Sequence, residues 1–217
     1  MSNDLTRVQL FFKDKLSSRI STSSKTSKEF SSPFSLNLFD YDLFDEDIQK
    51  ITNLIILTDK FNSVNIRLSQ NLSSSNTLSK LLRKISLKKQ FKSLGFYIKN
   101  LNDELLNVFL EFIGKMQETV NSLKLKIKYN DEKKEESICG KILENLIKCN
   151  CLDSLHFDKF HFSSENNIKL LENVVSENKS LKNLIFNNCI ININYFYINI
   201  RKMIHFIKDI SLLIYQI

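Results

Sequence analysis

The sequence predicts an α/β solenoid in which short parallel strands alternate with helices in a series of similar units. Three observations indicate this fold class. A short apolar pattern returns at a nearly constant step, each copy alternates apolar and other residues as a half-buried strand does, and the segments between copies have helical periodicity. The 217 residues are 42% hydrophobic and 25% charged, which is typical of a folded chain.

The repeated pattern consists of an apolar residue, two other residues, an apolar residue, one other residue and a third apolar residue. Six copies follow one another at steps of 29 to 32 residues, and so regular a step is not expected by chance. A weaker copy starts at Pro33 and has Leu36 and Leu38 in the matching places. The six copies start at Phe61, Phe91, Val120, Leu152, Leu181 and Ile210.

The fourth and sixth places of each copy point to one side of a predicted strand, because side chains alternate along a strand. The segments that follow the strands carry apolar residues at helical spacing, and Asn102 is the predicted N-cap of one of these helices. Each unit exposes too much apolar surface to be stable alone, so the units must stack on one another. The apolar helix faces are formed by Leu105, Leu106, Phe109, Phe112, Ile113 and Met116; by Ile138, Ile142, Leu143 and Leu146; and by Ile168, Leu171, Val174 and Val175.

The fullest copy has Leu181, Leu184, Phe186, Cys189 and Ile191 at its first, fourth, sixth, ninth and eleventh places. This pattern resembles the leucine-rich repeat, whose ninth place takes Asn or Cys. The period is most similar to that of the ribonuclease-inhibitor-like class, in which each unit pairs one strand with one full helix. The resemblance covers roughly residues 33–217 and implies a horseshoe-shaped solenoid with a parallel sheet on its concave face and helices on its convex face. Earlier copies depart from the pattern at the ninth place, which holds Ser69, Lys99, Lys128 and Phe160.

We expect two regions in the chain. Residues 1–30 are rich in Ser, Lys and Thr and are predicted to form a flexible tail, with residues 8–12 apolar enough to join an N-terminal cap. Residues 31–217 are predicted to form a leucine-rich-repeat domain of about six to seven units. The last copy ends the sequence inside a strand without a polar capping unit, which indicates a fragment, a truncated reading frame or a segment that pairs with another chain.

The N-terminal residues lack the basic and apolar regions of a secretory signal, and the chain has no run of about eighteen uncharged apolar residues. We therefore expect no membrane span and a cytoplasmic or nuclear location. In such a compartment the cysteines are expected to be reduced thiols.

The third, fifth and seventh places of each strand are predicted to face outward on the concave side of the sheet. These places form a mixed surface with a basic centre, one histidine and Tyr97 as its single aromatic residue. We expect a protein partner to bind there, because solenoids of this kind generally bind on that face. The alternative is that these side chains are merely solvated. The predicted partner-binding residues are Arg67, Tyr97, Lys124, Lys126, His156 and Asp158.

A second candidate surface is the basic segment at residues 80–92, which contains no acidic residue. Leu81, Leu82, Ile85 and Phe91 would form an apolar stripe beneath a positively charged convex face of one helix. Such a helix suits the phosphates of a nucleic acid, an anionic membrane or an acidic partner, whereas the alternative is an ordinary solvated helix face. The predicted phosphate-binding residues are Lys84, Lys88, Lys89 and Lys92.

The sequence gives little support for catalysis. Cys149 and Cys151, with His156 and His161, are too closely spaced, and too interleaved with apolar repeat positions, to predict a zinc site. Cys149 at a helix end and Cys151 before a strand are instead predicted to be small buried residues. The sequence has no glycine-rich phosphate loop, and no nucleophile and base can be singled out as a pair. We expect no enzyme activity, metal, cofactor or small-molecule substrate.

The sequence therefore favours a protein–protein interaction scaffold that binds its partner on the concave face. A nucleic-acid-associated protein that uses the basic segment at residues 80–92 is the second hypothesis. A regulator of a small GTPase or an adaptor subunit of a ubiquitin ligase is the third, and it rests on fold analogy alone.

Overall fold

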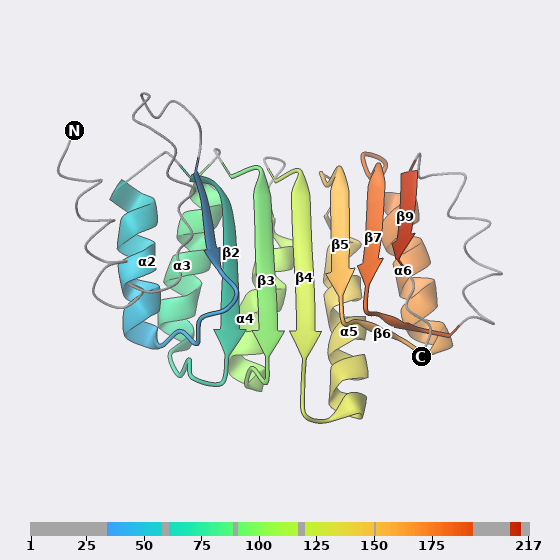
Figure 1. Ribbon diagram of the computed structural model, residues 1–217, viewed down its shortest axis with the longest axis horizontal. Helices are drawn as coiled ribbons and strands as arrows, with labels where there is room; N and C mark the ends of the chain where they lie inside the picture. The colour runs from blue at the N-terminus through green and yellow to red at the C-terminus, as the bar shows by residue number, and fades with distance from the viewer. Residues whose placement is uncertain are drawn as a thin grey trace.

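The computed structural model describes residues 34–57, 61–88, 91–116, 120–149, 151–192 and 209–213. Strands and helices alternate along these segments (Figure 1). The tail expected at residues 1–30, with its apolar segment at residues 8–12, lies outside the described residues. The elements are β1 (Phe34–Leu38), α2 (Asp45–Leu57), β2 (Phe61–Ser69), α3 (Ser75–Leu87), β3 (Ser93–Lys99), α4 (Asp103–Gly114), β4 (Ser122–Lys128), α5 (Glu132–Leu146), β5 (Ser154–Asp158), β6 (His161–Phe162), α6 (Glu165–Glu177), β7 (Asn183–Asn187), β8 (Ile190–Ile191) and β9 (Asp209–Leu213).

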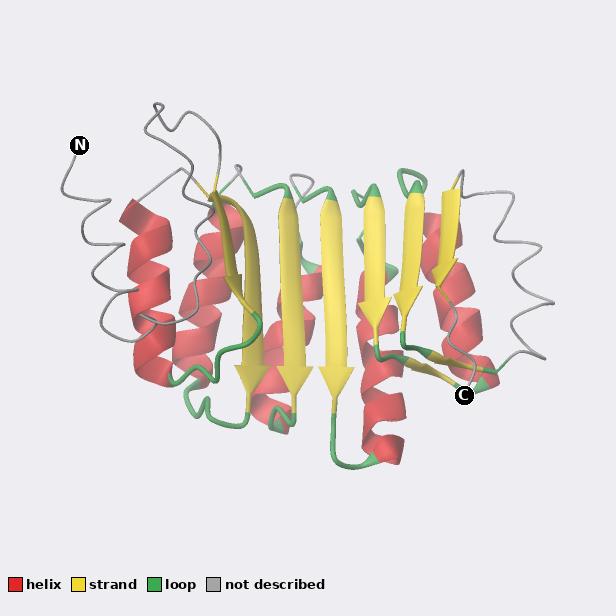
Figure 2. Cartoon of the chain, viewed as in Figure 1, coloured by secondary structure: helices red, strands yellow, loops and turns green. Residues whose placement is uncertain are grey.

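One seven-stranded sheet runs through the described part of the chain in the order β1-β2-β3-β4-β5-β7-β9, and all of its neighbouring strands pair in parallel. The helices lie side by side on one face of this sheet, behind the strands in the view of Figure 2. A short second sheet, formed by β6 and β8, follows the ends of β5 and β7. The fold is therefore an α/β arrangement of repeated strand–helix units, and the helices leave one face of the sheet uncovered.

The strands pair in the register that the repeat predicts from β2 to β7. Residues at the same place of successive copies are direct partners, so each place forms a ladder across the sheet. The third-place ladder contains Ser63, Ser93, Ser122, Ser154 and Asn183; the fifth-place ladder Asn65, Gly95, Lys124, His156 and Ile185; and the seventh-place ladder Arg67, Tyr97, Lys126, Asp158 and Asn187.

The core lies between the sheet and the helices. Fourth-place and sixth-place residues of β2 to β7 are at most 1% exposed, and the predicted apolar faces of α4, α5 and α6 are buried against them. Apolar ladders that stack across successive units gain dispersion contacts on both sides, which a single unit cannot supply. The fully buried ladders are Val64, Leu94, Leu123, Leu155 and Leu184, and Ile66, Phe96, Leu125, Phe157 and Phe186.

The helices begin at polar caps. Asn102 is the N-cap of α4, as predicted, and its side chain accepts a hydrogen bond of 2.9 Å from the backbone N–H of Leu105. Ser74, Asp131 and Ser164 cap α3, α5 and α6 in the same way. These caps satisfy backbone donors that the first turn of a helix leaves free, and they stop each helix from extending toward the preceding strand.

The last predicted copy pairs in a different register. The repeat predicts Ile210 at a first place, but β9 pairs Ile210 with Leu184, a fourth-place residue, and Leu212 with Phe186, a sixth-place residue. The segment Ile210-Ser-Leu-Leu-Ile has apolar residues on both sides of a strand, so its sequence permits pairing in either register.

Among the described residues no helix is long and apolar enough to cross a membrane.

Candidate functional site

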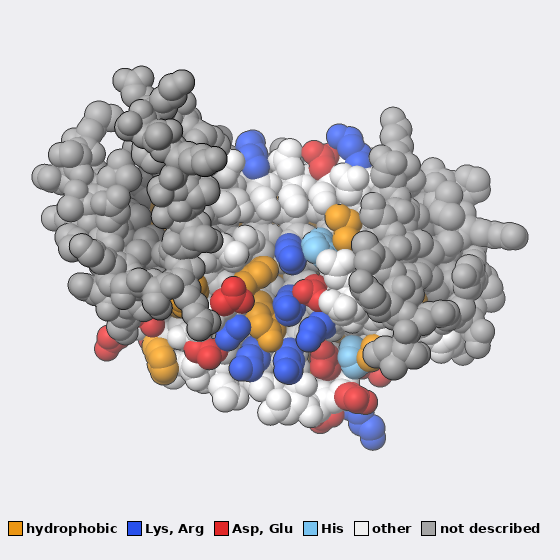
Figure 3. Space-filling view, in the orientation of Figure 1, with side chains coloured by type: hydrophobic (Ala, Val, Ile, Leu, Met, Phe, Trp, Pro, Cys, Tyr) orange, Lys and Arg blue, Asp and Glu red, His pale blue; other side chains and the backbone are white. Residues whose placement is uncertain are grey.

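The candidate site is the face of the sheet that the helices leave uncovered, termed here the open face. It carries the third-, fifth- and seventh-place ladders. Figure 3 views this face and shows Lys and Arg side chains gathered over the middle of the described surface, with Asp and Glu side chains among them. All six residues predicted to bind a partner stand in two neighbouring ladders, so the structure brings them together on one surface.

Tyr97 lies at the centre of this charged area, because its seventh-place neighbours are Arg67 on β2 and Lys126 on β4. The guanidinium carbon of Arg67 is 4.9 Å from the centroid of the Tyr97 ring, and the Nζ of Lys126 is 5.0 Å from it. These distances are typical of cation–π interactions. The ring therefore holds two cations in place, one from the strand on each side.

Phe39, in the turn after β1, adds a second aromatic ring to the open face. Its ring meets Tyr97 edge to face, with centroids 6.5 Å apart and an interplanar angle of 81°, and Lys124 Nζ lies 5.8 Å from its centroid. Gly95 makes room for this ring, because a β-carbon at Gly95 would come within 2.8 Å of Phe39 Cζ and would collide with the side-chain oxygen of Asn65. The expectation that Tyr97 would be the single aromatic residue on this face is therefore wrong.

Asp42 fixes the orientation of Arg67. Its carboxylate accepts a hydrogen bond of 2.8 Å from Arg67 Nη1, while Arg67 Nε donates to the backbone oxygen of Phe39 at 2.7 Å. The hydrogen bond from Arg67 is the main reason that the pKa of the Asp42 carboxyl is held below its usual value. Half of the Asp42 side chain remains exposed, so the ion pair lies at the surface.

Asp158, also predicted to contact a partner, is buried, so little of its own side chain is open to such a contact. Its side chain is 11% exposed and lies 3.4 Å from Lys126 Nζ, and it also accepts a hydrogen bond of 3.4 Å from Asn188 Nδ2. A carboxylate loses hydration when it is buried, and polar partners of this kind offset part of that loss. Asp158 is therefore a residue that positions Lys126.

His156 stands beside Lys124 in the fifth-place ladder. Its Nε2 lies 2.8 Å from Asn187 Nδ2, which fits an imidazole nitrogen that accepts a hydrogen bond. Partial burial is the main cause that lowers the pKa of His156, and the charge of Lys124 lowers it further. Both effects favour a neutral imidazole, so His156 contributes shape and a hydrogen bond to the open face rather than charge.

Three further lysines extend the basic surface without forming an ion pair among the described residues, although the charge of Lys99 helps to lower the pKa of the Asp42 carboxyl. Lys99 and Lys128 are direct neighbours at the ends of β3 and β4, and Lys124 lies on β4 with the same orientation as Lys126. By contrast, the third-place ladder at the other end of the strands carries serines and no charge from β2 to β5. The open face is therefore divided into a small polar end and a basic end.

The basic segment at residues 80–92 is not one helix. α3 ends at Leu87, Lys88 is its C-cap, and Lys92 lies just before β3. Phe91 is fully buried as the first place of the next copy, so the chain must leave the helix before it. Lys89 lies outside the described residues.

The remaining basic side chains of α3 point away from the core, as predicted. Leu81, Leu82 and Ile85 are buried, whereas Lys80 and Arg83 are exposed and Lys84 is half-buried. Lys88 Nζ donates to the backbone oxygen of Ile56 at 3.4 Å, which draws its charge toward the end of α2. Lys84, Lys88 and Lys92, three of the lysines predicted to bind phosphate, are therefore not gathered on a single helical surface.

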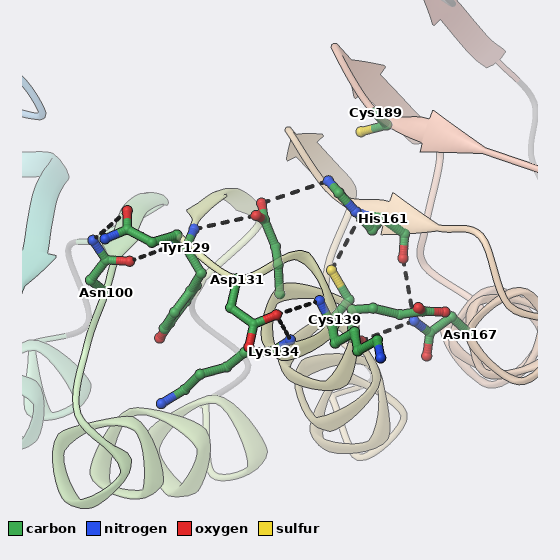
Figure 4. A network of polar contacts seen from close by, with 12 residues as sticks. Asn100, Tyr129, Asp131, Lys134, Cys139, His161, Asn167 and Cys189 are labelled. Carbon is green, nitrogen blue, oxygen red and sulfur yellow. Dashed lines mark hydrogen bonds and ion pairs between the residues drawn. The ribbon is translucent and has the colours of Figure 1, made fainter.

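A second polar cluster joins α5 to the neighbouring units (Figure 4). Glu135 is buried, and its Oε2 accepts a hydrogen bond of 3.3 Å from the backbone N–H of Tyr129 while its Oε1 lies 3.9 Å from His161 Nε2. The backbone N–H of His161 donates to Cys139 Sγ at 3.4 Å. Burial is the largest cause of the raised pKa of Glu135.

This cluster contains a thiol, an imidazole and a carboxylate but lacks the geometry of a nucleophilic site. The Cys139 sulfur meets the backbone N–H of His161, and burial raises the pKa of its thiol, which disfavours the thiolate that would attack a substrate. The cluster is suited to linking the stacked units of the solenoid.

The Cys149–Cys151 pair likewise shows no metal geometry. The two sulfur atoms are 3.6 Å apart in free thiols, and the hydrogen bond between them, followed by burial, raises the pKa of Cys149. Cys149 is buried as predicted, but Cys151 is only half-buried. Within the described residues, no group of three or more His, Cys, Asp and Glu side chains could hold a metal ion.

The sequence reasoning missed Phe39 and Asp42 as parts of the open face. Phe39 follows Leu38, so it holds the seventh place of the weaker copy that starts at Pro33, and that copy was one signal for it. Asp42 lies further along the connection to α2, beyond the ladders. A second signal was present: a glycine inside a strand often marks the close approach of another group, and Gly95 is such a residue.

Comparison with models of protein families finds none that matches this chain, and comparison with curated protein sequences finds no match. The class that the fold defines is an α/β protein with repeated strand–helix units and a parallel sheet.

Proposed function

We propose that this protein is a leucine-rich-repeat-like scaffold that binds a protein partner on the open face, the concave side of a horseshoe. The observation that carries the proposal is the set of oriented side chains around Tyr97. Arg67, Lys126 and Phe39 are each held by at least one further contact, so a partner would meet groups that are already ordered. Such preorganisation reduces the entropy lost on binding.

The ninth place supports the comparison with leucine-rich repeats. Cys189 Sγ lies 3.5 Å from the backbone oxygen of Phe157, in the preceding unit, and 3.4 Å from that of Asn187. A ninth-place thiol thus links two successive turns of the backbone. The strand–helix order and a step of 29 to 32 residues fit the same class.

A nucleic-acid-associated function is the second candidate, favoured by the exposed side chains of Lys80 and Arg83 on α3. It has less support, because Lys88 is drawn toward Ile56 and Lys92 lies off the helix. The open face supports it little, because the cations on Tyr97 occupy the ring that would otherwise stack against a base.

The test is capture of proteins from native extract by the full chain, carried out both with and without nuclease. The open-face variant Tyr97→Ala/Lys124→Glu is compared with the matched α3 variant Lys80→Glu/Arg83→Glu. We expect a set of proteins that the wild type and the α3 variant capture and the open-face variant loses. Capture that the open-face variant retains would contradict the proposal, and nuclease-sensitive material lost only by the α3 variant would favour the second candidate.

A further inference from the structure

We propose that the basic end of the open face binds an acidic segment of a protein partner in extended conformation, with carboxylates on alternate residues. This inference rests on the proposed function and names the chemistry of the partner. The basic end is defined by Arg67, Lys99, Lys124, Lys126 and Lys128.

The first observation is that lysines of β3 and β4 lie close together on the open face. Lys99 and Lys128 are direct neighbours in the pairing of β3 with β4, and like charges placed opposite one another on a sheet are destabilising. Lys124, Lys126 and Lys128 also follow one another on the same side of β4. Among the described residues Lys126 is the one of these four lysines that forms an ion pair, with Asp158, and the charge of Lys99 helps to lower the pKa of the Asp42 carboxyl. A bound anion would relieve the repulsion that remains, above all at Lys124 and Lys128.

The spacing of the lysines indicates the form of the ligand. Alternate residues of a strand lie about 6.6 Å apart, so Lys124, Lys126 and Lys128 form a row with that repeat. An extended peptide presents the side chains of its own alternate residues at the same spacing. Carboxylates at every second residue of such a peptide can therefore each face one lysine of β4.

The aromatic rings favour an acidic peptide over single-stranded nucleic acid. Binding of single strands relies on bases that stack on exposed aromatic faces. Here Arg67 and Lys126 lie over the Tyr97 ring, and Lys124 lies over the Phe39 ring. A base would need an open ring face on which to stack. The cations that cover the rings instead offer hydrogen-bond donors, which suit carboxylate oxygens.

The intramolecular ion pair of Arg67 shows what this surface accepts. Asp42, from an exposed turn, places a carboxylate oxygen 2.8 Å from Arg67 Nη1 beside the two rings. The basic end thus already holds one carboxylate supplied by a flanking segment of chain. A partner that carries several carboxylates would bind the neighbouring lysines by the same chemistry.

The experiment measures binding of labelled synthetic peptides to the full chain by fluorescence anisotropy at low salt. The acidic probe is an acetylated decapeptide of alternating Glu and Thr, and its matched control has Gln in place of each Glu. A single-stranded and a duplex oligonucleotide are the competing probes. The variant Lys124→Gln/Lys128→Gln is compared with Lys80→Gln/Arg83→Gln, which removes the same charge from α3.

We expect the Glu probe to bind and the Gln probe to bind at least about tenfold more weakly. The β4 variant should lose about tenfold in affinity for the Glu probe, and the α3 variant less than about twofold. Circular dichroism melting confirms that both variants fold. Equal affinity of the wild type and the β4 variant for the Glu probe, or tighter binding of an oligonucleotide that the β4 variant abolishes, would overturn the inference.

The two proposals can fail separately. If the Glu probe does not bind while capture of proteins from extract still depends on the open face, the acidic segment is the wrong partner and the scaffold function stands. If capture is also independent of the open face, the scaffold function fails with it.

Discussion

Gly95 lies directly beneath the ring of Phe39, so close that a β-carbon at Gly95 would come within 2.8 Å of Phe39 Cζ. The absence of a side chain at this fifth place is what lets the turn after β1 lay an aromatic ring over the sheet. The same β-carbon would collide with the side-chain oxygen of Asn65. Both neighbours are ends of side chains, so they can move aside at little cost, but Phe39 would then leave Tyr97 and Lys124.

The substitution Gly95→Ala should therefore affect binding more than stability. We expect the free energy of unfolding to change by less than about 1 kcal/mol, because the displaced groups are side-chain ends. The affinity for the alternating Glu-Thr peptide should fall several-fold. In the Phe39→Ala background the same substitution should have no further effect on affinity, and an additive loss there would show that Gly95 acts by another route.

Two neighbouring residues of β5 test the register of the sheet. Leu155 is fully buried, whereas Ser154 lies on the open face beside Ser122. Leu155→Asp should cost more than about 3 kcal/mol of unfolding free energy and destabilise the adjoining units, because it buries an unpaired charge. Ser154→Asp should change stability by no more than about 0.5 kcal/mol. Similar melting temperatures for the two variants would contradict the register.

The pair of Asp42 and Arg67 should make a small contribution to stability that depends on pH. The pKa of Asp42 is lowered in the folded protein, chiefly by the hydrogen bond from Arg67, so its contribution is present above the ordinary pKa of Asp and is lost as the pH falls through the lowered value. Because the pair is exposed, we expect less than about 1 kcal/mol.

Asp42→Asn should be less stable than wild type at pH 6, and the difference should shrink as the pH is lowered toward 3, as measured by urea unfolding. At neutral pH the same variant should bind the Glu-Thr peptide more tightly, because it removes a competing carboxylate from Arg67. Weaker binding by Asp42→Asn would instead mean that Asp42 is needed to hold Arg67 in position.

Glu135 should show the opposite dependence on pH. Its pKa is raised, chiefly by burial, so the folded state favours the protonated carboxyl, and stability is lost as the pH rises from the ordinary pKa of Glu through the raised value. Glu135→Gln retains an oxygen that can accept the hydrogen bond from Tyr129 and removes the buried charge.

The variant Glu135→Gln should therefore gain melting temperature relative to wild type at pH 7, and gain less at pH 4. Glu136→Gln, which changes the next residue on the less buried side of α5, is the control and should show no such trend. A larger gain at pH 4 than at pH 7 would mean that the ion pair with His161 outweighs the burial of Glu135.

Residues that follow the repeat were the predictable part of this fold. The ladders from β2 to β7 and the buried faces of α4, α5 and α6 come from periodicity alone, because stacking requires each unit to bury the same places. The register of β9 was not predictable, because its sequence is apolar at both alternations. Helix α3 was predicted too long because residues 80–92 combine the last turns of the helix with the first place of the next repeat copy, Phe91.

The candidate site was predictable only in part, for a related reason. Arg67, Tyr97, Lys124, Lys126 and His156 stand at repeat places that periodicity assigns to the outer side of the strands. Periodicity does not reveal that Asp158 is buried and in contact with Lys126 and Asn188, because those contacts depend on the tertiary arrangement of neighbouring units. Phe39 holds the seventh place of the weaker copy, but its contacts with Tyr97 and Lys124 depend on tertiary structure that the repeat does not encode.

The central claim is that partners bind the open face, and site-specific photo-crosslinking tests it most directly. A benzophenone amino acid is placed at Ser93, on the open face of β3, or at Lys80, on the exposed side of α3, and each protein is irradiated in nuclease-treated native extract. We expect discrete protein adducts from position 93 that an excess of unlabelled wild-type protein competes away, and none from position 80. Competed adducts that form at position 80 and not at position 93 would contradict the claim.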